Sequence, residues 1–476
     1  MDLLFLASEV APWSKTGGLG DVAGALPRAL AARGHRVVVA TPRYGSIDPA
    51  GRGLRRVDLT LHARGERAGA YVADGPAPVY FIEHERLFGH RRGLYGEHGR
   101  DYPDNAARFA FFTRAALDLP AALGFSPRVV HLNDWQTALG AWLVRHEKQE
   151  LAWARGARTV LTIHNLAYQG VFGKHEVPAV GLPWEVFRYE AMEFYDQLNF
   201  MKAGLVFADA LTTVSPTYAR EILTPESGNG LDPQLRHRAR DLHGILNGID
   251  VREWDPAADP HLPARFSRDD LSGKAACKEA LQRELRLPVR PGVPLVGMVG
   301  RLAEQKGLDL VAAALPDLLR QDVQVAVLGS GRHDYEELFR RVAREQPDRL
   351  AAHVGFDEGL AHRIEAGADV FLMPSRFEPC GLNQMYSLRY GTVPVVRAVG
   401  GLEDTVEDYD GFRSGTGFKF REYQPRALLT AVRRALDLYR DRRAWAGLQA
   451  RGMAQDFSWD RSAQTYERLF ESLAAR

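Results

Sequence analysis

Short, almost wholly apolar runs alternate with segments of helical periodicity, and this alternation restricts the fold more than any other feature of the chain. Strands that are apolar on both faces need cover on both faces, so the pattern predicts an α/β fold with a largely parallel sheet between helices. In such sheets, ligands bind outside the carboxyl ends of the strands. The apolar runs of the first half are residues 3–7, 37–41, 79–83, 129–132, 159–163 and 210–216.

The pattern occurs twice. A polar, proline-rich stretch at residues 255–267 interrupts it, and a strand-like run at residues 295–299 restarts it. Two doubly wound domains that face each other would place a cleft between two sets of strand ends. The expected parts are an N-terminal domain at residues 1–246, a linker and hinge at 247–267, a second domain at 268–455 and a final helical segment at 456–476.

Charge and cysteine content exclude several classes of function. The 61 Lys and Arg residues balance the 60 Asp and Glu residues, so no overall field favours nucleic acid. Two cysteines cannot form a disulfide framework, which fits a reducing compartment. No signal-peptide pattern and no apolar run of about 20 residues is present. We expect a cytoplasmic protein without membrane or nucleic-acid partners; the pattern does not indicate its oligomeric state.

A glycine-rich stretch, Ser14–Asp21, follows the first apolar run and precedes a helical segment. A strand, a glycine turn and a helix start can form an anion site, because residues without side chains expose the unpaired N–H groups of the first turn. Lys15 adds a mobile positive charge. The alternative is a tight turn whose glycines only permit close packing. The spacing matches neither a dinucleotide fingerprint nor a Walker A loop.

Arg301 and Lys306 follow the run at residues 295–299. A pair of cations before a helix start suits a diphosphate, since Arg offers a planar fork and Lys a compact charge. The alternative is a solvated loop with surface ion pairs.

The string Ser375–Leu382 is the most specific in the chain. Glu378 can bond sugar hydroxyls, and the N–H groups after Gly381 can hold a phosphate. A helix-capping role for Glu378, worth ~0.3–1 kcal/mol, is the alternative. We expect Cys380 to be a buried packing residue, since no histidine partner for a nucleophile is evident.

His164 ends the run at residues 159–163 and so lies at the predicted ligand edge, although a structural histidine is the alternative. Other histidines are scattered and show no metal-ligand spacing. We therefore expect no metal site and no cofactor.

Five motifs, in this order along almost the whole chain, resemble those of bacterial glycogen synthases and plant starch synthases. The motifs are Lys15–Val22, His131–Trp135, Asn247–Asp250, Gly300–Leu302 with Gln305–Gly307, and Arg376–Leu382. The resemblance implies a GT-B fold and retaining transfer of glucose from ADP-glucose to the non-reducing 4-OH of an α-1,4-glucan.

The resemblance also assigns roles to residues. It implies that Lys15 binds the donor, that Arg301 and Lys306 hold its diphosphate, that Glu378 contacts the glucose and that His164 approaches the reacting sugar. Further residues that it places along the cleft or against the donor are Gly17, Gly18, Asp21, Asp134, Asn247, Cys380, Gly381, Leu382 and Asn383.

Two positions depart from related patterns. Many retaining relatives of the fold carry a second Glu where this chain has Tyr386, which favours front-face attack assisted by the leaving phosphate. Asn383 stands where this branch commonly has Thr, which puts one donor contact in doubt. The resemblance further implies that a final helix at residues 459–473 crosses back to the N-terminal domain, and that residues 247–255 include hinge positions for domain closure.

Three other functions stay open. A GT-B transferase that uses a UDP-sugar differs only in the contacts to the base. A nicotinamide-dependent oxidoreductase fits the alternating pattern but lacks the glycine spacing. A non-catalytic glucan-binding protein is the third, although the predicted donor loops are intact.

Overall fold

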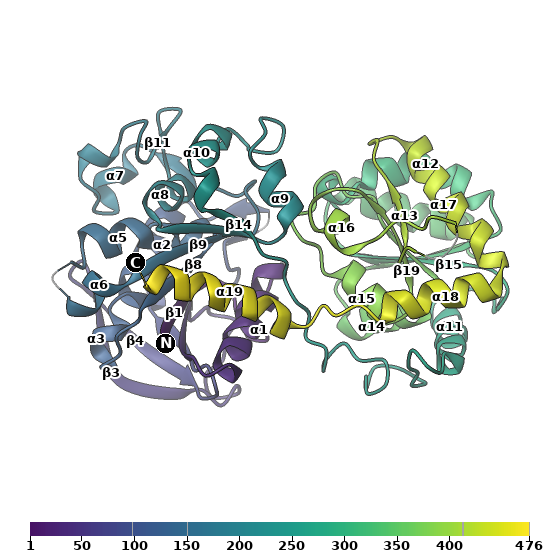
Figure 1. Cartoon of the computed structure of the whole chain (residues 1–476), viewed down its shortest axis with the longest axis horizontal. Coiled ribbons are helices and arrows are strands. Elements are labelled where there is room, and N and C mark those ends of the chain that lie inside the picture. Colours follow the sequence, from purple (N-terminus) through teal and green to yellow (C-terminus); the bar gives the residue numbers. More distant parts are fainter. Residues whose placement is uncertain (98, 150, 412–413, 476) are drawn as a thin grey trace. The chain divides into compact units, whose positions relative to one another are not determined.

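The computed structural model describes residues 1–97, 99–149, 151–411 and 414–475 (Figure 1). The chain forms two compact units. The first consists of Met1–Gly248 together with Trp459–Arg476, and the second of Ile249–Ser458. The chain therefore enters the second unit after Gly248 and leaves it after Ser458.

A nine-stranded sheet forms the centre of the first unit, in the order β14-β13-β9-β8-β1-β2-β5-β4-β3. Neighbours from β14 to β5 are parallel, whereas β4 is antiparallel to both β5 and β3. The strands are β1 (Asp2–Leu6), β2 (Arg36–Pro42), β3 (Arg55–Ala63), β4 (Glu66–Ala73), β5 (Val79–Glu83), β8 (Val129–Asn133), β9 (Arg158–Ile163), β13 (Ala210–Thr213) and β14 (Leu242–Gly244).

The predicted parallel sheet is confirmed for the strands from β14 to β5, and the hairpin β3–β4 extends it. All residues of β8 are buried, as expected for a strand that is covered on both faces. By contrast, β3 alternates exposed and less exposed residues along much of its length, which is typical of an antiparallel strand with one face in water. The absence of a continuous apolar run explains why sequence analysis missed this hairpin.

Helices and two small sheets complete the first unit. Tyr466 and Phe470 of α19 pack their rings against His131 of β8, and α19 also contacts α1. The last segment of the chain is therefore part of this unit. The helices are α1 (Gly18–Ala32), α2 (Asn105–Ala116), α3 (Leu119–Ala122), α4 (Trp135–Ala138), α5 (Gly140–His146), α6 (Ala152–Gly156), α7 (Glu176–Ala179), α8 (Phe200–Phe207), α9 (Pro216–Glu221), α10 (Asp232–His237) and α19 (Trp459–Ala474), with short turns η1 (Glu85–Gly89), η2 (Trp184–Val186) and η3 (Ala239–Asp241). The small sheets consist of β10 (Val171–Gly173), β12 (Gln197–Asn199) and β11 (Glu193–Phe194), and of β6 (Gly96–Glu97) and β7 (Arg100–Asp101).

The second unit has a six-stranded, wholly parallel sheet in the order β17-β16-β15-β18-β19-β20. If the six strands are numbered 1 to 6 in chain order, their order in the sheet is 3-2-1-4-5-6. This is the strand order of a doubly wound dinucleotide-binding sheet. The strands are β15 (Leu295–Val299), β16 (Gln324–Gly329), β17 (Leu350–Val354), β18 (Val370–Met373), β19 (Val393–Arg397) and β20 (Phe418–Phe420).

Two apolar clusters lie on opposite faces of this sheet. Along β16, Val325 and Val327 join a cluster with α12 and α17, whereas Ala326 and Leu328 join one with α11 and α14. Successive strand residues point to opposite faces, so helices cover both sides, as Figure 1 shows. The predicted α/β, doubly wound architecture is confirmed. The helices are α11 (Ser272–Glu284), α12 (Leu308–Leu319), α13 (His333–Glu345), α14 (Glu358–Gly367), α15 (Asn383–Arg389), α16 (Gly400–Thr405), α17 (Pro425–Arg440) and α18 (Arg442–Met453), with the short turn η4 (Glu304–Lys306).

Residues 255–267, expected to be a linker, contain no helix or strand but fold onto the second unit. Phe266 is buried with Cys277, Tyr390 and Met453, and further apolar residues of the segment pack against this cluster. The segment is thus part of the core of the second unit, because its scattered apolar residues provide anchors that its polar composition obscures. No described helix is long and apolar enough to cross a membrane.

Candidate active site

Several predicted site residues follow the two strands that flank the switch point of each sheet, where the chain changes the side on which it adds strands. In the first unit, β1 and β8 are neighbours; Lys15 follows β1 and Asp134 follows β8. In the second unit, β15 and β18 are neighbours; Lys306 follows β15 and Glu378 follows β18. Ligands of doubly wound proteins bind outside the carboxyl ends of the strands at such points.

The glycine-rich loop of the first unit is held by a carboxylate. Glu9 Oε2 accepts hydrogen bonds from the N–H groups of Thr16 (2.6 Å) and Gly17 (3.3 Å). Glu9 Oε1 accepts from the hydroxyls of Thr16 and Tyr95, each at 2.6 Å. The N–H groups that remain available to bind an anion at this loop are therefore those from Gly18 onward, at the start of α1. The residue that fixes the loop, Glu9, was missed; the only signal was an acidic residue just beyond a buried strand.

Lys15 and Asp21 form an ion pair at 2.6 Å. The side chains are 46% and 24% exposed. A pair so accessible to water contributes about 0–1 kcal/mol, so an anionic ligand can take over the Lys15 ammonium at little cost.

Asp134 has an unusual backbone at the end of β8. Its φ of 55° is rare for a residue with a side chain, and strained residues of this kind cluster at functional sites. Its Oδ1 accepts hydrogen bonds from the N–H groups of His164 (2.7 Å) and Asn165 (3.4 Å). Burial raises the pKa of Asp134 to about 7, although both hydrogen bonds act to lower it. The carboxyl thus fixes the backbone at the end of β9.

His164 is buried and held by its ring as well as its backbone. His164 Nε2 lies 2.9 Å from Asn133 Oδ1, and Asn133 Nδ2 donates to the carbonyl of Leu6 (2.9 Å). Because the amide nitrogen of Asn133 is already a donor, its oxygen accepts, so Nε2 of His164 carries the proton. Burial lowers the pKa of His164 to about 3, which keeps the ring neutral near pH 7.

Asn247 carries a buried polar atom without a partner. The residue is 4% exposed, and its Oδ1 receives no hydrogen bond from any described residue. Leaving such an acceptor unsatisfied costs about 1–3 kcal/mol, so a bound molecule that donates to it has a physical reason to do so.

The loop after β15 carries the two predicted cations. Arg301 is exposed and donates to Gln305 Oε1 (3.2 Å). Gly307 ends the loop with a φ of 73°, and a Cβ there would lie 2.0 Å from the carbonyl oxygen of Pro374. The loop therefore approaches the segment after β18 so closely that only glycine fits.

This approach brings Lys306 and Glu378 together. Lys306 Nζ lies 2.7 Å from Glu378 Oε2, and Ser375 Oγ donates to the same oxygen at 3.0 Å. The Glu378 side chain is 6% exposed and that of Lys306 is 28% exposed. The alternative role of Glu378 as a helix cap is wrong, because α15 begins after Leu382 without a side-chain cap.

The following residues shape the turn into α15. Gly381 has a φ of 73°, a conformation that favours glycine. Cys380 is buried, whereas Leu382 is partly exposed. Asn383 Nδ2 donates to the carbonyl of Val299 (2.8 Å), so one N–H of its amide ties α15 to β15, and the second N–H and the amide oxygen are left for the expected donor contact.

Gly400 also supports this loop, and sequence analysis gave it no role. Its φ is 44°, and a Cβ there would lie 1.9 Å from the carbonyl oxygen of Glu378. The N–H group of Gly401 donates to that same oxygen at 3.2 Å. The Gly-Gly pair after β19 was the available signal, since it allows close approach of two backbones.

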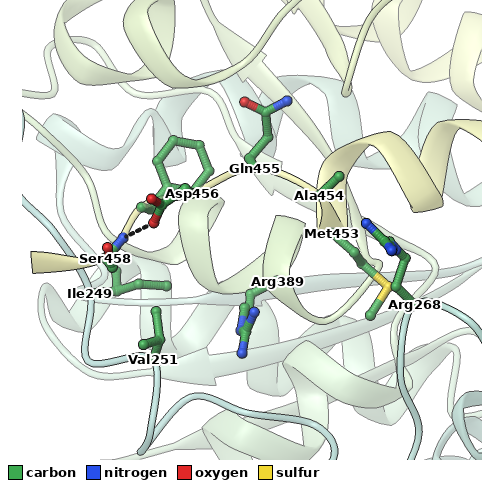
Figure 2. A pocket seen from close by; sticks show the side chains of 10 residues that line it. Ile249, Val251, Arg268, Arg389, Met453, Ala454, Gln455, Asp456 and Ser458 are labelled. Carbon is green, nitrogen blue, oxygen red and sulfur yellow. Dashed lines mark hydrogen bonds between the residues drawn. The ribbon is translucent and has the colours of Figure 1, made fainter. Parts of the chain in front are cut away.

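A separate hollow of about 310 Å³ lies in the second unit, where the chain enters and leaves it (Figure 2). Arg268 and Arg389 line it together with Asp456, whose carboxylate accepts from the N–H group of Ser458 at 2.9 Å. No predicted site residue is part of its described lining.

Comparison with known proteins agrees with this geometry. Residues 2–237 match the model of the starch synthase catalytic domain, and residues 284–449 match that of glycosyl transferases group 1. The glycogen synthase of Anaeromyxobacter dehalogenans (strain 2CP-C) is 73% identical over 474 residues, which cover 100% of both chains. That of Myxococcus xanthus (strain DK1622) is 52% identical over 485 residues, again 100% of both. The chain belongs to the glycogen synthase family.

A solved structure of this family confirms the predicted GT-B fold class. The catalytic domain of starch synthase IV from Arabidopsis thaliana, bound to ADP and acarbose, is 36% identical. It aligns with a TM-score of 0.92 over 100% of this chain and 99% of its own. The motif-based resemblance to glycogen and starch synthases is confirmed as well.

Proposed function

We propose that this member of the glycogen synthase family transfers glucose from ADP-glucose to the 4-hydroxyl group at the non-reducing end of an α-1,4-glucan, with retention of configuration and release of ADP. Membership of the family makes the chain a glucan-elongating glycosyltransferase. The observation that carries the residue assignments is the contact of Lys306 with Glu378 at the switch point of the second sheet. The ADP in the starch synthase IV structure supports an adenine nucleotide as donor.

The chemistry asks for positive charge on one side of the bond that breaks. Cleavage of the glycosyl–phosphate bond leaves positive charge on the sugar and negative charge on the departing ADP. Arg301 and Lys306 stabilise the diphosphate, Arg301 as a planar fork and Lys306 as a compact charge. When Lys306 turns to the phosphate, the carboxylate of Glu378 is available to accept from glucose hydroxyls.

The first unit contributes neutral and cationic groups. Lys15 binds the donor at the start of α1, with the Gly18 N–H group beside it. His164 presents its backbone carbonyl and its neutral ring to the reacting sugar, because Asp134 and Asn133 fix its orientation. Asn247 offers its unsatisfied Oδ1 to a hydroxyl of the ligand.

The reaction that we propose uses neither a metal ion nor a second carboxylate. Two cations at the leaving group can do the work that Mg²⁺ does in other phosphate enzymes. Tyr386 is buried, and its ring stacks on that of Trp254 at 3.7 Å between centroids. It has no carboxylate to form a covalent glycosyl intermediate, which supports front-face attack assisted by the leaving phosphate. We place the activity in the cytoplasm, consistent with two cysteines buried as thiols.

Incorporation of labelled glucose into primer glycogen tests the proposal. We expect transfer from ADP-glucose to exceed transfer from UDP-glucose at equal concentrations. Preference for UDP-glucose would overturn the choice of donor, and glucan binding without incorporation would make the chain a binding protein. Titration with NADH, read by absorbance, tests the oxidoreductase alternative, and we expect no binding.

A further inference from the structure

Three side chains of the second unit bring metal-ligand atoms together outside the loops described above. Glu253, Glu358 and His362 each offer one such atom, and the three atoms lie within 4.8 Å of one another. Glu358 and His362 are four positions apart in α14 and so share one face of the helix. Glu253 belongs to the segment by which the chain enters the second unit after Gly248. In the described residues, this is the one group of its kind.

The histidine of this cluster has one ring nitrogen occupied and one open. His362 is 1% exposed, and its Nδ1 lies 2.7 Å from Asp259 Oδ2. The hydroxyl of Tyr390 donates to the same oxygen at 2.6 Å, so this oxygen is an acceptor and Nδ1 of His362 carries a proton. Nε2 then keeps its lone pair, and no described residue donates a hydrogen bond to it.

This arrangement is the one that metal-binding histidines use. Such a histidine almost always donates its other ring N–H to a carboxylate or carbonyl, which fixes the tautomer and the ring orientation. The ring of His362 is also stacked on Trp254, with centroids 3.7 Å apart and an angle of 12° between the planes. His362 is therefore fixed in place before any ion arrives.

The ligand types select the ion. We propose that Glu253, Glu358 and His362 form a Zn²⁺ site, with water completing a four-coordinate shell. One imidazole nitrogen and two carboxylate oxygens suit Zn²⁺, whereas Ca²⁺ and Mg²⁺ prefer oxygen ligands alone. Ligands at about 2.1 Å in a tetrahedral shell lie about 3.4 Å apart, so distances between ligand atoms must shorten by up to about 1.4 Å. Glu253 and Glu358 are exposed and their side chains can make this adjustment, while His362 stays fixed.

The ion would join the entering segment to α14. Glu253 lies just beyond the point where the chain crosses into the second unit, so Zn²⁺ would tie this crossing to the core of that unit. The site shares no residue with the loops that carry Lys306 and Glu378. Zn²⁺ should therefore stabilise the folded chain.

Zinc binding to the full chain, freed of metal by a chelator, tests the site. We expect one Zn²⁺ per chain in competition with a chromophoric chelator, and a rise in Tm that Mg²⁺ at the same concentration does not produce. Glu253→Gln and Glu358→Gln should each lower the Zn²⁺ affinity at least about tenfold and remove the rise in Tm. Glu345→Gln, at the exposed end of α13, is the matched control and should bind as the wild type does.

The two glutamate variants decide the outcome, because His362→Gln removes a buried, stacked ring and can fail to fold. Glu358→Gln, which lies outside the predicted hinge segment 247–255, should keep the wild-type kcat in the glycogen assay. Absence of stoichiometric Zn²⁺ binding by the wild type overturns the proposal. Wild-type Zn²⁺ affinity in both glutamate variants overturns it as well, since the ion then binds other groups among the 15 histidines.

Discussion

Lys306 Nζ lies 2.7 Å from Glu378 Oε2, although the two residues are 72 positions apart in the chain. The contact exists because β15 and β18 are neighbours and their carboxyl ends meet at one edge of the sheet. The two side chains differ in exposure, at 28% and 6%, so the pair is not symmetric. Water can solvate Lys306 without its partner, whereas Glu378 depends on Lys306 and Ser375.

Lys306→Ala should lower kcat/KM for ADP-glucose about 10- to 100-fold, because a charge-assisted hydrogen bond to phosphate is worth ~1.5–3 kcal/mol. It should also lower Tm, since it removes a partner from the buried Glu378 carboxylate. Steady-state kinetics and thermal unfolding measure the two effects. Lys306→Arg, which keeps the charge, should recover part of the activity. Wild-type kinetics in Lys306→Ala would refute the phosphate role.

Glu378→Gln should lower kcat much more than it lowers Tm. The amide oxygen can still accept from Ser375 Oγ, and Lys306 is exposed enough to be solvated, so folding loses little. The loss of the carboxylate removes the strong acceptor for glucose hydroxyls. Comparison of kcat with the free energy of unfolding checks this. Unchanged kcat together with a large loss of stability would make Glu378 a structural residue only.

Asn247→Ala should weaken catalysis with little loss of stability. Its Oδ1 has no partner among the described residues, so truncation breaks no hydrogen bond there. Asn133→Ala is the control, because Asn133 bonds both His164 and Leu6, and it should destabilise the fold by about 1–3 kcal/mol. We expect kcat/KM to fall at least tenfold in Asn247→Ala. Wild-type kinetics in that variant would remove Asn247 from the site.

EDTA should leave kcat largely intact, because the proposed chemistry relies on Arg301 and Lys306 at the leaving phosphate. It should lower Tm if Zn²⁺ is bound by Glu253, Glu358 and His362. Activity and Tm are measured on the same sample before and after dialysis against EDTA. Complete loss of activity that a single added metal restores would contradict the metal-free reaction.

The sequence predicted the parallel sheets because a strand buried on both faces leaves a continuous apolar run, as β8 and β15 do. It also predicted that Lys306 and Glu378 follow strands, and parallel topology then explains why they meet. The hairpin β3–β4 was missed because charged residues interrupt its apolar positions. The first two residues of β3, for example, are the exposed Arg55 and Arg56.

Tertiary contacts between distant segments account for what the sequence did not show. Glu9 accepts hydrogen bonds from the N–H groups of Thr16 and Gly17. From the glycine-rich motif alone, these two N–H groups would be expected to be available to a ligand. The sequence did not predict a ligand role for His362, because the histidines are scattered and show no metal-ligand spacing. Folding nevertheless places His362 close to Glu253, and a hydrogen bond to Asp259 orients its ring. Local pattern contains no information on such pairs, since each partner is an ordinary polar residue in its own segment.

Asp134 makes the stability of the fold depend on pH in a direction opposite to that of most carboxylates. Burial raises its pKa to about 7 in the folded chain, whereas an unfolded chain releases this proton near pH 4. Between these values the folded state binds the extra proton, so the free energy of unfolding falls as pH rises from about 4 to about 7. The full contribution, at most about 4 kcal/mol, is present below pH 4 and lost above pH 7.

Asp134→Asn isolates this effect. The amide oxygen can still accept from the His164 N–H group, but the side chain cannot titrate. Burial lowers the pKa of His164 to about 3, so His164 makes the free energy of unfolding rise with pH between about pH 3 and 6.5. His164 is present in both the wild type and Asp134→Asn. Its contribution therefore cancels in the stability difference between the two proteins. In denaturant titrations, we expect the free energy of unfolding of the wild type minus that of Asp134→Asn to decrease from pH 4.5 to 7.5. Asp58→Asn, at an exposed position, is the control, and the corresponding difference should not change over this range. A pH-independent difference for Asp134→Asn would mean that the carboxyl is ionised throughout this range, so that its two backbone hydrogen bonds outweigh its burial.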